Sequence, residues 1–221
     1  MTFDILTLFP PMFNSPFDQS IVKRAQQKRA IKINIHDLRN WAIDKRGTVD
    51  DRPYGGGVGM IMRVEPIYKA LEEVKSEINK SKVILMDARG AKFTQEKARE
   101  YSKLDELVII CGHYEGVDQR VVDHLIDESI SIGDYVLTGG EIPAMVIVDA
   151  VTRLIPGVLE KPEATLNESF SNLEPRTSNL GPYIEHPQYT RPEEFNGWTV
   201  PKVLLSGNHG KIKQWREDVK K

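Results

Sequence analysis

Short apolar runs rich in β-branched residues recur along the chain as far as Pro156, and runs of this kind predict strands. The predicted strands are residues 3–9, 31–38, 82–86, 107–111 and 129–132. Between them lie segments with apolar residues at helical spacing, most clearly Val64, Ile67, Leu71, Val74 and Ile78. Strands that alternate with amphipathic helices indicate an α/β fold, in which helices cover a parallel sheet.

The pattern changes after Pro156. Residues 159–183 show no period and are rich in proline, serine and asparagine, which is typical of a long loop or linker. A helical pattern returns where Ile212, Trp215 and Val219 share one face, with basic residues around it. We therefore predict a large α/β domain over residues 1–159, an interdomain linker over 160–182, and a small C-terminal helical module over 183–221.

Composition narrows the class of protein. The formal net charge of −2 excludes a generally basic nucleic-acid coat, so any RNA contact needs locally concentrated positive charge. The single cysteine, Cys111, excludes an internal disulfide framework and suits a reducing cytoplasm. No signal-peptide pattern opens the chain, and no apolar stretch approaches the ~20 residues that span a membrane. We expect a cytoplasmic protein with no membrane partner.

A glycine-rich segment, residues 50–60, is the first candidate for binding. Consecutive glycines let backbone N–H groups approach an anion or a base. The segment has neither a Walker lysine nor the Gly-x-Gly-x-x-Gly spacing, so it does not indicate a nucleotide-phosphate site. A flexible turn is the alternative, but Tyr54 and the flanking charges favour a ligand or RNA loop.

Two further loops follow predicted strands, at residues 112–120 and 131–143. The carboxyl ends of parallel strands are where α/β sheets bind ligands. Apolar side chains mixed with free backbone groups suit an adenosine-like group, although ordinary strand–turn–helix connections would look similar. His113 has only Cys111 near it at ligand spacing, so no metal site is indicated.

Six motifs occur in order: YGGGxGM, CGxYEGxDxR, SIGDYVLTGGExPAM, DAVxRxxPGVL, HPxYTRP and VPxVLLSGNHxxIxxWR. Together they resemble, almost residue by residue, the motifs of the bacterial tRNA guanine-N1 methyltransferases of the knotted SPOUT class, which use S-adenosylmethionine. The resemblance runs from Phe3 to about Arg216. It implies a deep trefoil knot on the C-terminal side of the α/β domain and a homodimer whose tRNA site spans both subunits. Pattern alone could not indicate a knot, because chains rarely thread loops.

The resemblance also implies which residues hold the cofactor, S-adenosylmethionine. They belong to the two loops after the predicted strands. They are Gly112, Tyr114, Glu115, Gly116, Ile132, Gly133, Asp134, Tyr135, Val136, Leu137, Gly139, Gly140 and Pro143.

The implied reaction moves a methyl group to N1 of guanosine 37, next to the anticodon. N1 carries a proton, so the site needs a base near N1 and a cation near O6. Arg153 matches the family's arginine for the second role; a charge on a helix surface is the alternative. Glu168 stands where the family has an aspartate, and its carboxylate lies one carbon further out, ~1.5 Å. Glu163 and Glu174 are rival bases.

The tRNA anticodon arm is the expected partner, and eight residues are expected to contact it: Tyr54, Gly55, Gly56, Ser169, His209, Lys211, Lys213 and Arg216. The chain departs from the family at residues 87–90, where Asp-Ala-Arg-Gly replaces Ser-Pro-Gln-Gly, and in its longer linker. Nothing in the residues indicates whether Mg²⁺ is required. Three alternatives remain: a knotted methyltransferase with another target, an inactive RNA-binding relative, and a plain nucleotide-binding module.

Overall fold

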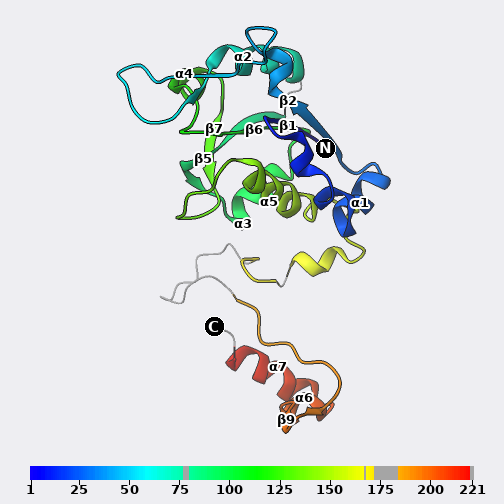
Figure 1. Ribbon diagram of the computed structural model, residues 1–221. Helices are drawn as coiled ribbons and strands as arrows, with labels where there is room; N and C mark the ends of the chain where they lie inside the picture. The colour runs from blue at the N-terminus through cyan, green and yellow to red at the C-terminus, as the bar shows by residue number, and fades with distance from the viewer. Residues whose placement is uncertain (77–79, 167, 172–183, 220–221) are drawn as a thin grey trace. The chain divides into compact units, whose positions relative to one another are not determined.

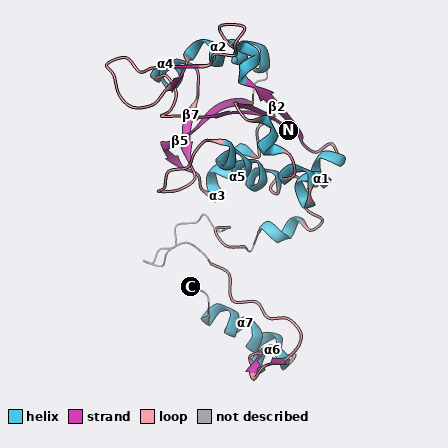
Figure 2. Cartoon of the chain, viewed as in Figure 1, coloured by secondary structure: helices cyan, strands magenta, loops and turns pink. Residues whose placement is uncertain are grey.

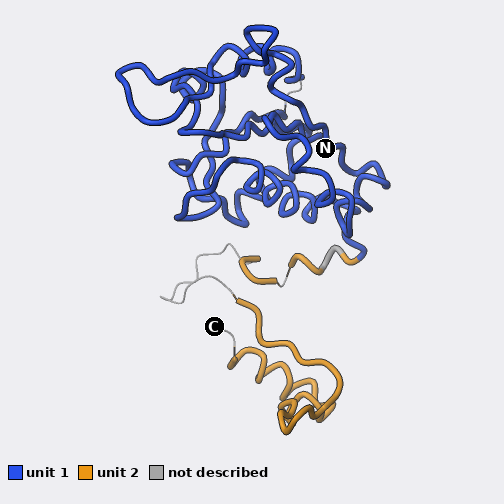
Figure 3. Tube along the Cα trace, viewed as in Figure 1, with its two compact units in different colours: residues 1–160 blue, residues 161–221 orange. Residues whose placement is uncertain are grey.

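The computed structural model describes residues 1–76, 80–166, 168–171 and 184–219. It divides into two compact units, Met1–Glu160 and Lys161–Lys221 (Figure 3). Residues 172–182 of the predicted linker lie outside the described residues. Each unit is described below by itself.

The first unit is built on a five-stranded sheet in the order β2-β1-β6-β5-β7, in which every neighbouring pair is parallel. This confirms the predicted α/β class with a parallel sheet. The strands are β1 (Thr2–Thr7), β2 (Lys32–Asp37), β5 (Ser81–Lys92), β6 (Glu106–Cys111) and β7 (Glu128–Ser131).

Helices cover both faces of this sheet (Figures 1 and 2). One face carries α1 (Ser20–Gln27), α3 (Gln95–Tyr101) and α5 (Glu141–Thr152), and the other carries α2 (Val64–Val74) and α4 (Gln119–His124). Short 3-10 turns, η1 (Pro10–Phe13), η2 (Pro16–Asp18) and η3 (Leu38–Trp41), complete the connections.

Central strand β6 shows why the sheet is parallel and covered on both sides. Every one of its residues is buried. Leu107, Ile109 and Cys111 join the core that includes α5, whereas Val108 and Ile110 join the core that includes α2. Because neighbouring side chains of a strand point to opposite faces, a strand buried on both faces is a continuous apolar run.

The predicted strands have the right positions, but β5 is much longer than expected. It continues beyond Met86, and the register with β7 shifts between Met86 and Ala91. Gly90 makes this possible, because a Cβ there would lie 2.4 Å from the backbone nitrogen of Ile130. Helix α2 ends at Val74, and Ile78 of the predicted helical pattern lies outside the described residues.

The second unit contains the short turn η4 (Pro162–Thr165), a hairpin of β8 (Glu194–Phe195) and β9 (Trp198–Thr199), and the helices α6 (Lys202–Leu205) and α7 (His209–Asp218). Helix α7 confirms the predicted C-terminal helix; Asn208 caps it by accepting the Lys211 N–H. The hairpin was not foreseen. Its turn, Asn196-Gly197, has positive φ at both residues, and Asn-Gly is a known hairpin signal in sequences.

Among the described residues, no helix combines the length and the apolar composition needed to cross a membrane.

A smaller pair of strands, β3 (Asp50–Asp51) and β4 (Ile61–Met62), closes the base of the glycine-rich loop in the first unit.

An ion-pair cluster ties α3 to the start of β5 and to β7. Lys82 lies 2.6 Å from Glu100 and 3.1 Å from Glu128, and Lys97 contacts the same two carboxylates at 3.0 and 2.9 Å. The hydrogen bond from Lys82 is the main cause that lowers the pKa of Glu100. Burial acts to raise the pKa of Glu128, but the bonds from Lys97 and Lys82 outweigh it and lower that pKa.

We predict that Glu100→Gln lowers the free energy of unfolding near neutral pH, by at most about 1 kcal/mol because the pair is partly exposed. A lowered folded-state pKa contributes stability above the ordinary value of 4.5, and this is lost as the pH falls through the folded-state pKa. Urea unfolding at several pH values should therefore show the difference from wild type shrinking below pH 4.5. Glu96→Gln, on the exposed side of the same helix, is the control. A difference that persists unchanged into strong acid would contradict this prediction.

Candidate functional site

A pocket of about 160 Å³ opens at the carboxyl ends of β6 and β7 and against the middle of β5. Its walls are formed by the middle of β5, the loops after β6 and β7, and the first turn of α5. The lining residues are Leu85, Met86, Asp87, Ala88, Gly112, His113, Tyr114, Glu115, Gly116, Val117, Ile130, Ser131, Ile132, Gly133, Tyr135, Val136, Leu137, Thr138, Gly139, Gly140 and Pro143. The two loops singled out in the sequence therefore do meet, as expected for adjacent ends of parallel strands.

All residues expected to hold the cofactor line this pocket except Asp134. The Asp134 carboxylate is exposed and forms an ion pair with Lys92. Its neighbours Gly133 and Tyr135 still line the pocket, because neighbouring loop residues point in different directions. The part of Asp134 in cofactor binding stays a prediction.

Glycines in these loops allow backbones to pack directly on one another. The Gly140 N–H donates to the Gly112 carbonyl at 2.8 Å, and His113 pairs with Gly139 in an isolated bridge. A Cβ on Gly140 would lie 2.7 Å from Cα of Cys111 and 2.8 Å from the Gly112 nitrogen. The close approach of two chain segments, rather than phosphate binding, explains why glycine stands here.

Tyr114 and Glu115 form the rim nearest the glycine-rich loop. Tyr114 has a positive φ of 60°, which is uncommon for a residue other than glycine. Burial and the nearby charge of Asp50 raise the pKa of its phenol, so the group remains a hydrogen-bond donor at neutral pH. The Glu115 N–H donates to the Met60 carbonyl at 3.1 Å, and a Cβ on Gly59 would lie 2.5 Å from the Glu115 side chain.

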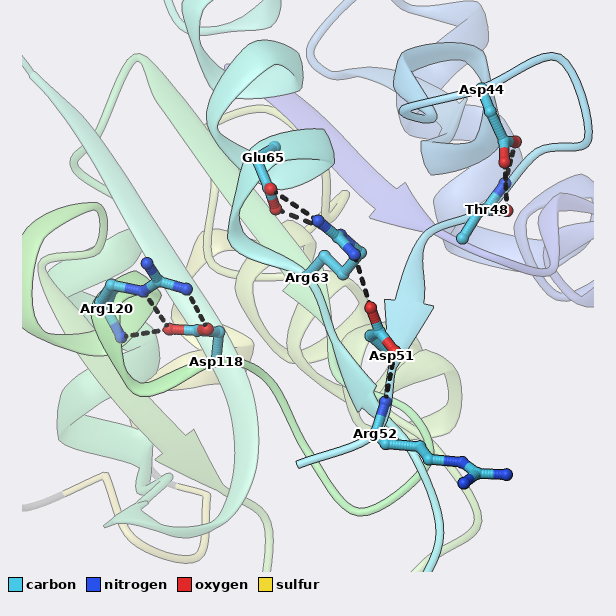
Figure 4. A network of polar contacts seen from close by, with 8 residues as sticks. All are labelled: Asp44, Thr48, Asp51, Arg52, Arg63, Glu65, Asp118 and Arg120. Atoms are coloured by element: carbon cyan, nitrogen blue, oxygen red, sulfur yellow. Dashed lines mark hydrogen bonds and ion pairs between the residues drawn. The ribbon is translucent and has the colours of Figure 1, made fainter. Parts of the chain in front are cut away.

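The glycine-rich loop is anchored at its base and open at its tip. Arg63 bridges Asp51 at 2.7 Å and Glu65 at 2.8 Å, next to a second pair formed by Arg120 and Asp118 (Figure 4).

Tyr54 lies in the tip of this loop and is fully exposed. Gly55 and Gly56 have positive φ and no neighbouring atom within 4 Å of a built Cβ. These three residues, which belong to the set expected to contact RNA, are therefore accessible on a loop with a fixed base.

The predicted catalytic pair is divided between the two units. Arg153 follows the last residue of α5 and is half-buried in the first unit. Glu168 and Ser169 belong to the second unit, where the Ser169 N–H donates to the Glu185 carboxylate at 3.2 Å. The rival Glu174 and the side chain of Glu163 lie outside the described residues. The meeting of Arg153 and Glu168 stays a prediction.

A groove of about 450 Å³ lies within the second unit, between the HPxYTRP segment and α7. Its walls combine the aromatic rings of His186, Tyr189 and Trp215 with Arg191 and Arg216. The other basic residues expected to contact RNA, His209, Lys211 and Lys213, lie exposed on α7. Arg216 alone of the predicted RNA contacts lines the groove.

Four further pocket residues were not assigned to the cofactor from the sequence: Asp87 and Ala88, where the chain departs from the family motif, and His113 and Thr138. Asp87 and Ala88 come directly after the β5 residues that pair with β6. The predicted strand ends at Met86, and ligands of α/β sheets bind where parallel strands end, so the same reasoning would have found these two residues. Among the described residues, no group of three or more His, Cys, Asp or Glu side chains is placed to hold a metal ion.

The fold and the pocket define the class first: an α/β protein with a ligand site at the carboxyl ends of its parallel strands. Comparison with known proteins defines the family. Residues 1–221 match the family described as tRNA (Guanine-1)-methyltransferase TrmD, and the chain belongs to that family.

Three relatives, each named tRNA (guanine-N(1)-)-methyltransferase, are similar over 98% of this chain. The protein of Dehalococcoides mccartyi is 52% identical and is covered over 84% of its length. Those of Geobacter sp. strain M21 and Citrifermentans bemidjiense are 53% and 54% identical, and 83% of each is covered.

We predict that Gly140→Ala destabilises the first unit by about 3 kcal/mol, because the new methyl group would overlap backbone atoms that cannot move aside. Thermal and urea unfolding measure the loss. Gly210→Ala is the matched control, since its Cβ would lie 3.5 Å from its nearest neighbour, Oδ1 of Asn208. Wild-type stability in Gly140→Ala would show that the two loops are not held this close.

Proposed function

We propose that this protein transfers a methyl group from S-adenosylmethionine to N1 of guanosine 37 in tRNA, next to the anticodon. One observation carries the proposal above all: the residues that the family motifs mark for the cofactor converge on one pocket at the strand ends. Family membership over the whole chain and the names of relatives at about half identity support the same reaction.

The pocket fits the chemistry of S-adenosylmethionine. Leu137, Val136 and Ile132 give it apolar walls for an adenosine, and backbone segments of the two loops line the space beside them. Glu115 and Asp87 place carboxylates at the same pocket, which suits a ligand with positive charges. When bound, the cofactor supplies an electrophilic methyl group on a positively charged sulfur.

The protein's own part is to make N1 of the guanine a nucleophile. We assign the base to Glu168, which would take the N1 proton, and the stabilising cation to Arg153, which would face O6 as negative charge develops there. Arginine stays charged and offers two donors to one oxygen. The two residues belong to different units of the chain.

The RNA contacts would come from both units. The exposed loop tip with Tyr54, Gly55 and Gly56 offers a ring and open backbone for stacking and hydrogen bonding. Basic side chains on α7 would contact phosphates of the anticodon arm, an interaction that salt weakens. The full set is Tyr54, Gly55, Gly56, Ser169, His209, Lys211, Lys213 and Arg216.

A homodimer accounts for an exposed apolar surface on the first unit. Ile142 and Val146 are 49% and 41% exposed on α5. A helix that is apolar all round is normally covered, so a second copy of the chain is the natural partner for this face.

The trefoil knot belongs to the same proposal. Its support is the passage of Gly140 directly over the Cys111 and Gly112 backbone. We also retain residues 160–182 as the linker, and the cytoplasm, where tRNA is modified, as the location.

A second candidate function is an inactive or differently specific RNA-binding relative. The observation that favours it is Glu168 in place of the family's aspartate, since a displacement of ~1.5 Å at a reacting proton can lower a rate greatly. Methyl transfer by the wild-type protein distinguishes the two.

We predict that Glu168→Gln lowers kcat for methyl transfer roughly 100-fold or more, because the amide cannot accept the N1 proton. The assay follows labelled methyl from S-adenosylmethionine into tRNA carrying guanosine at positions 36 and 37. Glu160→Gln is the matched control, because Glu160 is an exposed glutamate with one long ion pair, 3.7 Å from Arg24. Unchanged turnover would reject Glu168 as the base, and no transfer by wild type would favour the inactive relative.

We predict that replacing Lys211 and Lys213 together by glutamine raises KM for tRNA and lowers its salt dependence, because two phosphate contacts are lost. KM for S-adenosylmethionine should not change. Lys23→Gln, an exposed lysine on α1, is the control. The same salt dependence in the double variant and the wild type would exclude these lysines from the interface.

A further inference from the structure

A buried carboxylate lies directly behind the wall of the pocket. Glu141, the first residue of α5, is only 1% exposed. Its Oε1 accepts a hydrogen bond of 2.8 Å from the Thr7 hydroxyl, whose oxygen in turn accepts the Phe9 N–H at 2.9 Å. No lysine or arginine in the described parts of the chain forms an ion pair with Glu141. The basic group nearest to it there is the imidazole of His113.

His113 lies between this carboxylate and the pocket. Its ring packs on Phe9 at 4.8 Å and edge-on against Tyr114 at 5.1 Å, and the residue lines the pocket. Its Nδ1 atom is buried and makes no hydrogen bond within the described chain. The nearest carboxylate oxygen, Oε2 of Glu141, is 3.9 Å away.

The separation between His113 Nδ1 and the Glu141 carboxylate costs the folded state free energy. A buried ring nitrogen without a hydrogen-bond partner destabilises the folded state, and His113 Nδ1 is such an atom. At 3.9 Å the two groups are about 1 Å beyond hydrogen-bond distance. Gly139 runs beside both, and a Cβ there would lie 2.4 Å from Oε2 of Glu141 and 2.5 Å from Nδ1 of His113. The backbone at Gly139 therefore has no room for a side chain between the two groups.

We propose that Glu141 is a positioning residue that acts through His113, and that the bond between them closes when the cofactor occupies the pocket. This inference rests on the proposed function. The pair connects the end of β1, through Thr7, to the loop after β6 and to the start of α5. The latter two segments carry Tyr114, Glu115, Gly139 and Gly140, which form the pocket walls. Joining them would hold both walls in the arrangement that fits the cofactor.

The effect should fall on cofactor affinity rather than on the chemical step. Neither Glu141 nor His113 is assigned to the reacting guanine, so their loss should loosen the pocket and leave kcat nearly unchanged. Glu141→Gln keeps the size of the side chain and an acceptor for Thr7, but removes the negative charge. His113→Phe keeps a ring that can pack on Phe9 and Tyr114 but removes Nδ1, so that no donor faces the carboxylate.

The experiment measures the Kd of S-adenosylmethionine by calorimetry for wild type, Glu141→Gln, His113→Phe and the double variant. We expect each single variant to weaken binding about tenfold, which is 1.4 kcal/mol, and the double variant to be no weaker than either. Such non-additivity is the sign that one residue acts through the other. Kinetic assays should show the same change in KM for the cofactor, with kcat within about twofold.

A matched pair of variants separates positioning from general destabilisation. Thr7 and Thr152 are both fully buried, but the Thr152 hydroxyl has no hydrogen-bond partner among the described residues. Thr7→Val should therefore weaken cofactor binding by freeing the Glu141 carboxylate, whereas Thr152→Val should not. Histidine ¹⁵N spectra of wild type should show a change at His113 Nδ1 on cofactor addition, and this change should be absent in Glu141→Gln.

Additive losses in the double variant, or equal Kd values in all four proteins, would overturn the inference. If Glu141→Gln does not fold, His113→Phe and Thr7→Val give the same comparison from the two ends of the pair. Calorimetry needs no tRNA, so failure of wild type to methylate tRNA would refute the proposed reaction and leave this result standing. A wild-type protein that binds no S-adenosylmethionine would overturn both proposals.

Discussion

The close passage of the loop after β7 over the end of β6 is the constraint on which the site depends. Gly140 lies against the backbone of Cys111 and Gly112, with its N–H bonded to the Gly112 carbonyl. Only residues without side chains allow two backbones to approach so closely. After this crossing the chain enters α5, which is buried against the sheet. The packing of α5 therefore fixes the direction of the loop that forms one wall of the pocket.

Two kinds of interaction support this crossing from opposite sides. On the core side, Thr7 and the buried carboxylate of Glu141 tie the start of α5 to β1. On the solvent side, the glycine-rich loop packs its Gly59 against Glu115 and is fixed by the Arg63 ion pairs (Figure 4). The pocket is therefore held between a buried polar contact and a surface network. Such support from residues outside the site is what keeps binding geometry within narrow limits.

The division into two units shapes any account of the reaction. The pocket belongs to the first unit and the proposed base to the second, and the basic helix α7 lies in the second unit as well. In the proposed homodimer, a second copy of the chain would cover the exposed apolar residues of α5, Ile142 and Val146.

Much of the fold could be predicted from residue pattern. The apolar runs gave the position of each strand of the large sheet, because a strand buried on both faces leaves a continuous signal in sequence, as β6 does. The C-terminal helix followed from the spacing of Ile212 and Trp215. The hairpin at Asn196-Gly197 was predictable from its turn residues but was not foreseen, and the extension of β5 depends on Gly90 meeting β7, which local sequence does not reveal.

By itself, the sequence determined the elements and the loops in which pocket residues stand, since strand ends and glycines are local features. Tertiary structure alone decided which side chains of those loops face the pocket: it turned Asp134 outward to Lys92, and it brought Asp87, Ala88 and His113 inward. It also decided that Glu141, a charged residue on a helix start, is buried against Thr7 and faces His113. These partners are far apart in the chain, and no periodicity records a contact that exists only after the sheet and its helices have packed.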